Sequence, residues 1–292
     1  MSPLTLGVNL STSAARGADP VADALEAERL GFDFVSANDH PMGSSPTHEL
    51  WTLLAWVASR TSTIKVASRV LGVPYRNPAV VAKMAASLQA LSGGRLILGL
   101  GGGSSDEGIG AIGAGPLTPR AKTDGLEDAL RIIRGLWSGP GFTYEGVVHT
   151  VRDATIEPRP PLPIPIWTGT YGPRGLALTG ELADGWIPSL ELVPPERSGE
   201  TRARIVDAAV RAGRAPDAIA CIYNLEVRIG VVEGPDDAIV SGEPAQIIER
   251  LLGFVELGFS GMNFIVGGPD PAAQRERLAT EVMPGLRAAA PG

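Results

Sequence analysis

Asp39 and His40 are the residues whose types and position are best suited to acid–base chemistry. They come shortly after residues 32–36, an apolar run typical of a buried strand. An imidazole can accept or donate a proton near neutral pH, and an adjacent carboxylate can tune it. The alternative is that Asp39 caps a loop and His40 is structural. Because the pair stands at the end of a strand, we predict that Asp39 and His40 are catalytic, whereas His48 and His149 are structural.

Two glycine-rich segments have the composition of ligand-binding loops. Residues 99–103 include four glycines, which let backbone N–H groups approach an anion or a flat ring without interference from a Cβ atom. This run does not continue into the G-x-G-x-x-G pattern of dinucleotide-binding folds. Residues 169–175 (GTYGPRG) lead into a predicted helix whose N-terminal dipole end favours a phosphate, and Arg174 would add positive charge. The alternatives are a flexible loop for the first segment and, for the second, an ordinary helix start with Pro173 in its first turn.

Other chemistries have less support in the residue types. The three histidines lack the i, i+4 spacing of a helical metal site and no cluster of acidic ligands accompanies them, so we predict no metal. No G-x-S-x-G motif of a serine hydrolase is present. A glycosidase needs two carboxylates at strand ends, for which Glu107 and Glu226 are candidates. That reading is the strongest alternative among enzymes without redox chemistry.

The remainder of the chain alternates between short apolar runs and longer amphipathic segments. Predicted strands cover residues 4–10, 32–36, 64–71, 95–100, 164–170, 184–187, 219–229 and 262–266; predicted helices cover residues 19–30, 47–59, 78–91, 119–137, 172–182, 195–212, 244–257 and 271–289; a β-hairpin is predicted at residues 142–151. Strict alternation implies parallel strands with crossover helices, and about eight such units favour a closed barrel over an open doubly wound sheet. We therefore predict an α/β fold, a single (β/α)8 TIM-barrel domain over residues 1–292. Its active site should lie at the C-terminal ends of the strands.

Composition excludes several classes of partner. The net charge of −7 and the pI of about 5.1 describe an acidic surface, which repels nucleic-acid phosphates and anionic lipid. No apolar run reaches the length of a membrane span, so we predict no membrane partner. The single cysteine, Cys221, rules out an intrachain disulfide and fits a reducing cytoplasm. We expect a cytoplasmic enzyme with a small-molecule substrate and no nucleic-acid partner.

Several motifs together resemble the luciferase-like monooxygenase superfamily, in particular its coenzyme F420-dependent branch. They are residues 27–33 (AERLGFD), 38–40 (NDH), 75–79 (YRNPA), 91–101 (LSGGRLILGLG), 164–167 (IPIW) and 183–186 (ADGW). The resemblance covers nearly the whole chain. It implies a hydride transfer between a bound deazaflavin, coenzyme F420, and a small organic substrate, and by analogy with the family a homodimer.

The resemblance also implies roles for individual residues. A non-prolyl cis peptide that backs the deazaflavin ring would correspond here to the bond between Arg69 and Val70. His40 would face the redox edge of the ring, with Asp39 beside it. The residues implied at the cofactor are Asp39, Arg69, Val70, Gly102, Gly103, Gly169, Thr170, Gly172 and Pro173.

The sequence departs from the family pattern at three places. Ser104 stands where the sugar-phosphate dehydrogenases of this branch have an acidic residue. Arg69 is large and charged where a small residue is common, and it would meet an acidic substrate or the cofactor tail, or face solvent. The segment of residues 231–242 is short, whereas relatives often carry a helical insertion at this place. Two alternatives therefore stay open: an FMN-dependent monooxygenase supplied by a separate reductase, and a non-catalytic flavin-binding barrel.

Overall fold

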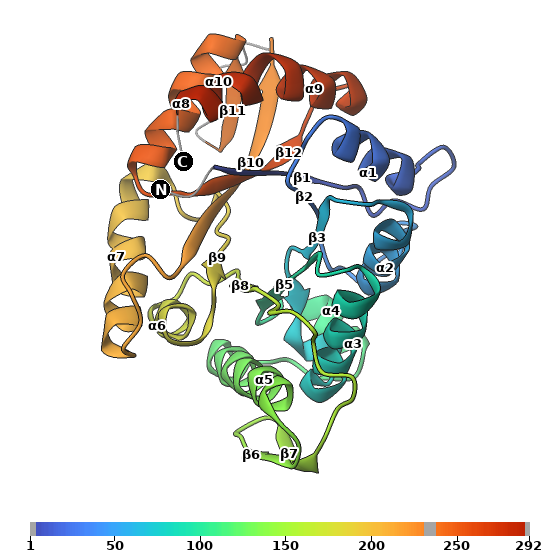
Figure 1. Cartoon of the computed structure of the whole chain (residues 1–292), viewed down its shortest axis with the longest axis vertical. Coiled ribbons are helices and arrows are strands. Elements are labelled where there is room, and N and C mark those ends of the chain that lie inside the picture. The colour runs from blue at the N-terminus through green and yellow to red at the C-terminus, as the bar shows by residue number, and fades with distance from the viewer. Residues whose placement is uncertain (1–3, 231–237, 290–292) are drawn as a thin grey trace.

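Eight strands form a closed parallel barrel in the computed structural model, which describes residues 4–230 and 238–289. In the order of the ring they are β1 (Thr5–Asn9), β2 (Phe34–Ala37), β3 (Lys65–Ser68), β5 (Leu96–Gly101), β8 (Ile166–Thr168), β9 (Gly185–Trp186), β10 (Ala220–Ile229) and β12 (Gly261–Val266). Each strand pairs in parallel with the next, and β12 pairs with β1 to close the ring. Helices surround the ring on its outside (Figure 1), so the predicted (β/α)8 barrel is confirmed.

Proline marks where most of the outer helices begin. These helices are α1 (Pro20–Arg29), α2 (Leu50–Arg60), α3 (Pro78–Leu91), α5 (Pro119–Ser138), α6 (Pro173–Leu182), α7 (Pro195–Arg211), α8 (Pro244–Glu256) and α9 (Pro271–Arg277). All of them except α2 start with proline, whose missing N–H would have no partner at that position. The side chains of Asp19, Asn77, Thr118 and Asp270 then accept N–H groups of the first turn. The proline-rich composition thus places helix starts after strand ends.

Four local features depart from the sequence prediction. The glycine run is followed by a short helix, α4 (Asp106–Ala111), and β3 is followed by β4 (Leu71–Gly72) and the 3-10 turn η1 (Val73–Tyr75). The strand β11 (Ile239–Gly242) adds a parallel edge strand to β10. Residues 271–289 divide into α9, the π-helical turn η2 (Leu278–Val282) and α10 (Met283–Ala289). The π-turn has a physical cause, because the ring of Pro284 would clash with the carbonyl group four residues earlier in a regular helix.

Two further expectations concern loops. The predicted hairpin is present as β6 (Phe142–Glu145) and β7 (Thr150–Ala154). Of the segment expected to be short, residues 231–237 lie outside the described residues, and the described part forms β11. Across residues 4–230 and 238–289, no helix has both the length and the apolar character that a membrane crossing requires.

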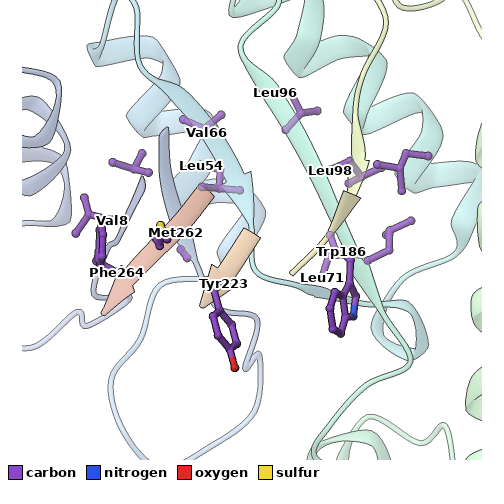
Figure 2. Close-up of a cluster of buried hydrophobic side chains, with 14 of the residues drawn as sticks. Val8, Leu54, Val66, Leu71, Leu96, Leu98, Trp186, Tyr223, Met262 and Phe264 are labelled. Carbon is purple, nitrogen blue, oxygen red and sulfur yellow. The ribbon is translucent and has the colours of Figure 1, made fainter. Parts of the chain in front are cut away.

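Apolar side chains pack on both sides of the barrel wall. On the outer side, residues such as Val8, Val66 and Phe264 meet apolar side chains of the helices, Leu54 of α2 among them (Figure 2). A separate inner cluster contains Phe34, Ala67, Ile97, Trp167, Ile187 and Ile222. The rings of Phe34 and Trp167 meet edge to face, with their centroids 5.3 Å apart. This inner cluster closes the barrel below the site.

A polar layer lies above the inner cluster, because side chains two positions apart on a strand face the same side. Asn9 follows Gly7, Ser36 follows Phe34, and Asn224 follows Ile222 at this spacing. Ser36 donates to Asn263 (2.8 Å), and Asn263 donates to Asn224 (2.8 Å). The barrel interior therefore changes from apolar to polar toward the C-terminal ends of the strands.

Glu28 holds the turn that leads into β3. Its Oε1 accepts the backbone N–H groups of Ser62 (2.8 Å), Thr63 (2.6 Å) and Ile64 (3.0 Å). Burial by itself would raise the pKa of the Glu28 carboxyl, but these bonds outweigh it and lower the pKa to about 2. The motif at residues 27–33 thus has a structural role, which Asp33 shares by accepting the N–H of Leu6 in β1 at 2.7 Å.

Glu28 should make the free energy of unfolding depend on pH in the acid range. The carboxyl ionises more readily in the folded chain, so its stabilisation is complete above the ordinary pKa of 4.5 and is lost as the pH falls toward about 2. We expect Glu28→Gln to remove roughly 1–2 kcal/mol of this dependence, less than the full shift because solvent screens the half-buried group. Urea unfolding at about pH 7, 4 and 3 measures it. Glu256→Gln, on an exposed residue at the end of α8, is the matched control; an unchanged pH dependence in Glu28→Gln would contradict the assignment.

Candidate active site

A cavity of about 630 Å³ opens at the C-terminal ends of the barrel strands. The loops after β2, β3, β5, β8 and β9 contribute most of its lining, and Asn224 of β10 contributes from the interior. Its lining residues are Asn38, Asp39, His40, Arg69, Val70, Gly72, Tyr75, Gly101, Gly102, Gly103, Ser104, Gly169, Tyr171, Ile187, Ser189, Glu191, Leu192 and Asn224. The structure thus brings together most of the residues that the sequence places at the site.

A second cavity of about 200 Å³ adjoins the first and shares Gly102, Gly169 and Tyr171 with it. Its other lining residues are Pro119, Lys122, Thr123, Leu126, Thr170, Gly172 and Gly175. Thr170 and Gly172 are among the residues that the family resemblance implies at the cofactor. Pro173 is not part of either lining; it occupies the first position of α6, immediately after Gly172.

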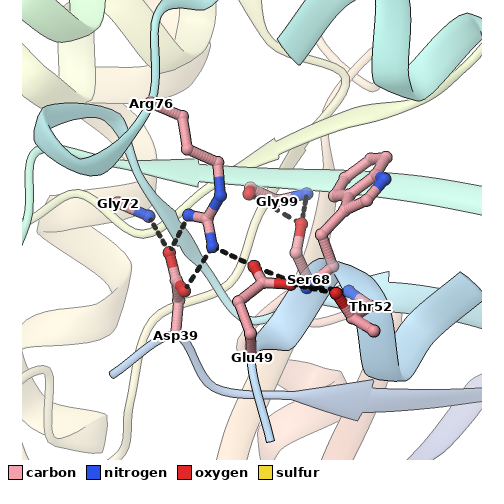
Figure 3. A network of polar contacts seen from close by, with 8 residues as sticks. Asp39, Glu49, Thr52, Ser68, Gly72, Arg76 and Gly99 are labelled. Atoms are coloured by element: carbon pink, nitrogen blue, oxygen red, sulfur yellow. Dashed lines mark hydrogen bonds and ion pairs between the residues drawn. The ribbon is translucent and has the colours of Figure 1, made fainter. Parts of the chain in front are cut away.

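The Arg69–Val70 peptide bond is cis, as the family resemblance implies. This bond follows Ser68, the last residue of β3. The backbone of β3 pairs with β5 up to Ala67, and at Ser68 the side chain makes the contact with β5. The Ser68 hydroxyl accepts the N–H of Gly99 and donates to its carbonyl oxygen, both at 2.9 Å (Figure 3). The side chain therefore joins the two strands where the chain changes direction.

Val70 explains three of the glycines in the two glycine-rich segments. A Cβ atom added to Gly99 would lie 3.0 Å from one methyl group of Val70. A Cβ atom added to Gly101 or Gly169 would lie 2.7 or 3.2 Å from the other methyl group. At Gly99 the Cβ would also lie 2.0 Å from the carbonyl oxygen of Ser68. These glycines leave room for Val70 and keep the adjacent cavity wall free of side chains.

Asp39 binds groups other than His40. Its carboxylate receives two hydrogen bonds from the Arg76 guanidinium, at 2.7 and 3.1 Å, and a third from the N–H of Gly72 at 2.9 Å (Figure 3). Arg76 also pairs with Glu49, the N-terminal cap of α2. Burial opposes the charge on Arg76, but its bonds to Asp39 and Glu49 raise the pKa of the guanidinium. Asp39 thus connects the loop after β2 to η1, a contact that the sequence prediction missed.

His40 is exposed to the cavity, next to the anchored Asp39. Among the residues that the structure describes, no hydrogen bond holds the imidazole, and the carboxylate of Asp39 does not donate to or accept from it. The hydrogen bonds of Asp39 therefore go to Arg76 and Gly72 and not to His40. Because the side chain of His40 is exposed and lines the cavity, its ring nitrogens are accessible to a molecule bound there.

Arg69 projects into the polar layer of the barrel. Its Nε donates to Oδ1 of Asn9 at 3.0 Å, and Asn9 in turn lies 3.4 Å from the hydroxyl of Ser36. Burial lowers the pKa of the Arg69 guanidinium to about 10, so it stays protonated at neutral pH. The cavity therefore contains a cation whose hydrogen-bond partner, among the residues that the structure describes, is a neutral amide.

Two charged side chains near the smaller cavity differ from expectation. Arg174 pairs with Asp124 and with Glu127, the latter at 2.8 Å, so its charge is already matched by carboxylates of α5. Lys122 of α5 instead lines the cavity, with its ammonium 2.6 Å from the exposed carboxylate of Asp106. Sequence reasoning missed Lys122 because it lies on a helix and follows no strand end.

The residues considered for other chemistries lie outside the larger cavity. Glu226 pairs with Arg228 at 2.7 Å, and neither Glu226 nor Glu107 contributes to the lining, so the structure does not bring these two carboxylates together in the cavity. Within the described ranges, no group of three or more His, Cys, Asp and Glu residues has an arrangement that could hold a metal ion.

Comparison with known proteins finds one matching family and, among the relatives, several F420-dependent dehydrogenases. The sequence profile of the luciferase-like monooxygenase family matches residues 2–238. An F420-dependent glucose-6-phosphate dehydrogenase of Microbacterium testaceum is 27% identical, over 98% of each chain. An F420-dependent hydroxymycolic acid dehydrogenase of Mycobacterium tuberculosis is 34% identical over 72% of this chain and 59% of that protein. A solved structure of an F420-dependent secondary alcohol dehydrogenase in complex with an F420–acetone adduct shares the fold, with a TM-score of 0.86 at 19% identity, over 98% of this chain and 99% of that one.

Proposed function

This chain belongs to the luciferase-like monooxygenase family, and we propose that it is an oxidoreductase that uses coenzyme F420 to transfer a hydride to or from a small organic molecule. The observation that carries the proposal is the pair of adjoining cavities at the strand ends. The larger one has room for a flat ring and a substrate beside His40. The smaller one contains Lys122 and suits an anionic tail. The family relationship supports the deazaflavin in particular, because several relatives are F420-dependent dehydrogenases.

The wall formed by the glycines and Val70 fits a flat ring. Gly101, Gly102 and Gly169 line the larger cavity without side chains, and Val70 packs behind two of them. A Cβ atom on Gly102 would lie 3.2 Å from the Cβ of Lys122, so a larger residue there would narrow the passage between the two cavities. We assign Val70, Gly102 and Gly103 to the ring and to the start of its tail.

The smaller cavity fits a phosphate. It lies at the N-terminus of α6, where no side chain caps the helix, and Gly172 adds no side chain to the opening. The positive end of the helix dipole would attract an anion. The Lys122 ammonium would do so by exchanging the exposed carboxylate of Asp106 for the bound anion, whereas the carboxylates that hold Arg174 are more buried. The hydroxyl of Thr170 is bound to Thr179 at 2.7 Å, so we assign the contact at this position to the backbone.

When it is bound, the deazaflavin supplies hydride chemistry at its C5 atom. The protein must then provide position, exclude competing reactions and move a proton. We assign the proton to His40, which would give it to the substrate or take it from the substrate, directly or through a water. Asp39 would act indirectly by fixing the loop that carries His40. The cytoplasmic location and the homodimer remain predictions.

The first test is a titration of the purified protein with coenzyme F420 and, separately, with FMN, followed by tryptophan fluorescence. Trp167 lies directly below the polar layer and reports on the cavity. We expect the deazaflavin to bind more tightly. Tighter binding of FMN would overturn the proposal in favour of an FMN-dependent monooxygenase with a partner reductase, and binding of neither would favour a non-catalytic barrel.

Lys122 offers a sharper test of the tail site. Lys122→Met should weaken F420 binding about 10-fold, because a charge-assisted hydrogen bond to an anionic group is lost. The matched control is Arg120→Met, which removes the same charge from an exposed position on the same helix. Equal affinities of Lys122→Met and the wild type would place the anionic tail elsewhere. The titration described above measures both variants.

A further inference from the structure

Arg69 has an unusual environment for a charged side chain. Its Nε is bound to Asn9, but its two terminal amino groups have no hydrogen-bond partner in residues 4–230 and 238–289, and no carboxylate forms an ion pair with it there. The other arginine in this region, Arg76, is bound by two carboxylates. A cation in a partly buried position ordinarily requires an anionic partner, because removal from water is costly.

The polar layer holds Arg69 in one orientation. Asn9 accepts from Arg69, and the hydroxyl of Ser36, which lies 3.4 Å from Oδ1 of Asn9, donates to Asn263 at 2.8 Å. This layer continues through Asn224 to the hydroxyl of Ser189, 3.1 Å away. Because these amides and hydroxyls satisfy one another, they support the guanidinium without neutralising it. Its unused N–H donors can then serve a molecule in the cavity.

The remaining charges of the cavity favour a monoanion. Asp39 is neutralised by Arg76, and the other carboxylate of the lining, Glu191, is exposed. Arg69 is thus the one fixed cation among the described lining residues of the larger cavity, and Lys122 lies in the smaller one. The two free amino groups of a guanidinium can bind two oxygens of a carboxylate or of a phosphate. One cation balances one negative charge, however, so the single guanidinium of this cavity matches a monoanionic carboxylate better than a dianionic phosphate.

The position of Arg69 separates it from the glycine wall. The side chain reaches from the end of β3 back to Asn9 on β1, whereas the glycines assigned to the deazaflavin belong to β5 and to the loop after β8. His40 enters the cavity from the loop after β2, the strand that lies between β1 and β3 in the ring. Arg69 and His40 therefore lie on the part of the cavity that a substrate would occupy.

We infer that the substrate of this enzyme carries a carboxylate, and that Arg69, oriented by Asn9, binds it. This inference rests on the proposed function, since it assumes that the cavity holds a substrate beside a deazaflavin. It assigns a substrate class, small organic acids, and gives a role to a residue that departs from the family pattern.

The test uses protein saturated with F420 and compares benzoate with its neutral isostere benzamide by isothermal titration calorimetry. We expect benzoate to bind about 10-fold more tightly than benzamide, and Arg69→Met to abolish the preference. Arg204→Met, which removes an equal charge from an exposed position on α7, should keep it. Arg69-dependent binding of phenyl phosphate that exceeds that of benzoate would overturn the assignment of a carboxylate.

A second variant protects the test against misfolding. Asn9→Asp leaves Arg69 in place but supplies an internal carboxylate 3.0 Å from its Nε, so the preference for benzoate should be lost here too. If the wild type does not bind F420, the proposed function fails. If it binds F420 but shows no Arg69-dependent preference, this inference alone fails. A weaker affinity for F420 in Arg69→Met, with the benzoate preference unchanged, would assign Arg69 to the cofactor and overturn the inference.

Discussion

Replacement of His40 by alanine should lower turnover by about 10²–10⁴-fold while the dissociation constant for F420 changes by less than about threefold. The reason is that the imidazole faces the cavity without a partner in the described residues, so it can reach a bound molecule but does not hold the fold together. His40→Gln, which keeps a hydrogen-bond donor of similar length but cannot exchange a proton near neutral pH, should lose nearly as much activity.

The measurement is the rate at which reduced F420 is oxidised with an acceptor that the wild-type enzyme turns over, combined with the fluorescence titration. His48→Ala is the matched control, because His48 is exposed and lies outside both cavity linings. Full turnover in His40→Ala would exclude the proton-transfer role. A loss of F420 affinity as large as the loss of turnover would instead assign His40 to cofactor binding.

The barrel could be predicted because its signals are local. Apolar runs of β length alternate with helices that begin at proline, and α3 has the predicted bounds at both ends. The features that escaped prediction depend on contacts or on backbone geometry with no periodic pattern. β11 is an edge strand that pairs with residues 226–229 at the end of β10, and the π-turn η2 depends on Pro284 inside a helix.

The site was predictable in outline, because strand ends of a parallel barrel converge on one face. His40, Arg69 and the glycines are therefore found together in one lining. The partners of these residues were not predictable, since they come from distant positions in the chain. Arg76 is 37 residues from Asp39, and Asn9 is 60 residues from Arg69. Adjacent sequence positions suggested that Asp39 serves His40, but Asp39 binds Arg76 and Gly72, while His40 faces the cavity without a partner among the described residues.

We therefore expect the main effect of replacing Asp39 to be a decrease in the stability of the fold. Asp39→Ala leaves the guanidinium of Arg76, which is 14% exposed, with Glu49 as its remaining carboxylate, and it removes the acceptor of the Gly72 N–H. Loss of one partner from a buried ion pair costs about 3–5 kcal/mol when the other charge is left uncompensated. Because Glu49 still pairs with Arg76, the lower end of this range applies here. We expect a decrease of this size in the free energy of unfolding, measured by urea denaturation of the same variants used for kinetics.

A double-mutant cycle separates this role from a catalytic one. Asp39→Asn and Arg76→Met should each destabilise the protein, and the double variant should be less destabilised than the sum of the two by on the order of 2 kcal/mol, because both charges of the Asp39–Arg76 pair are then removed together. Glu49 loses Arg76 in the double variant, but it keeps its hydrogen bonds to the first turn of α2. Turnover in the double variant should recover with stability if Asp39 only positions the loop that carries His40. If Asp39→Asn instead kept the wild-type stability but lowered turnover and altered its pH profile, the carboxylate would act on His40 directly, and the structural assignment would be wrong. The cycle thus decides whether Asp39 acts on His40 in the reaction or only stabilises the loop that carries it.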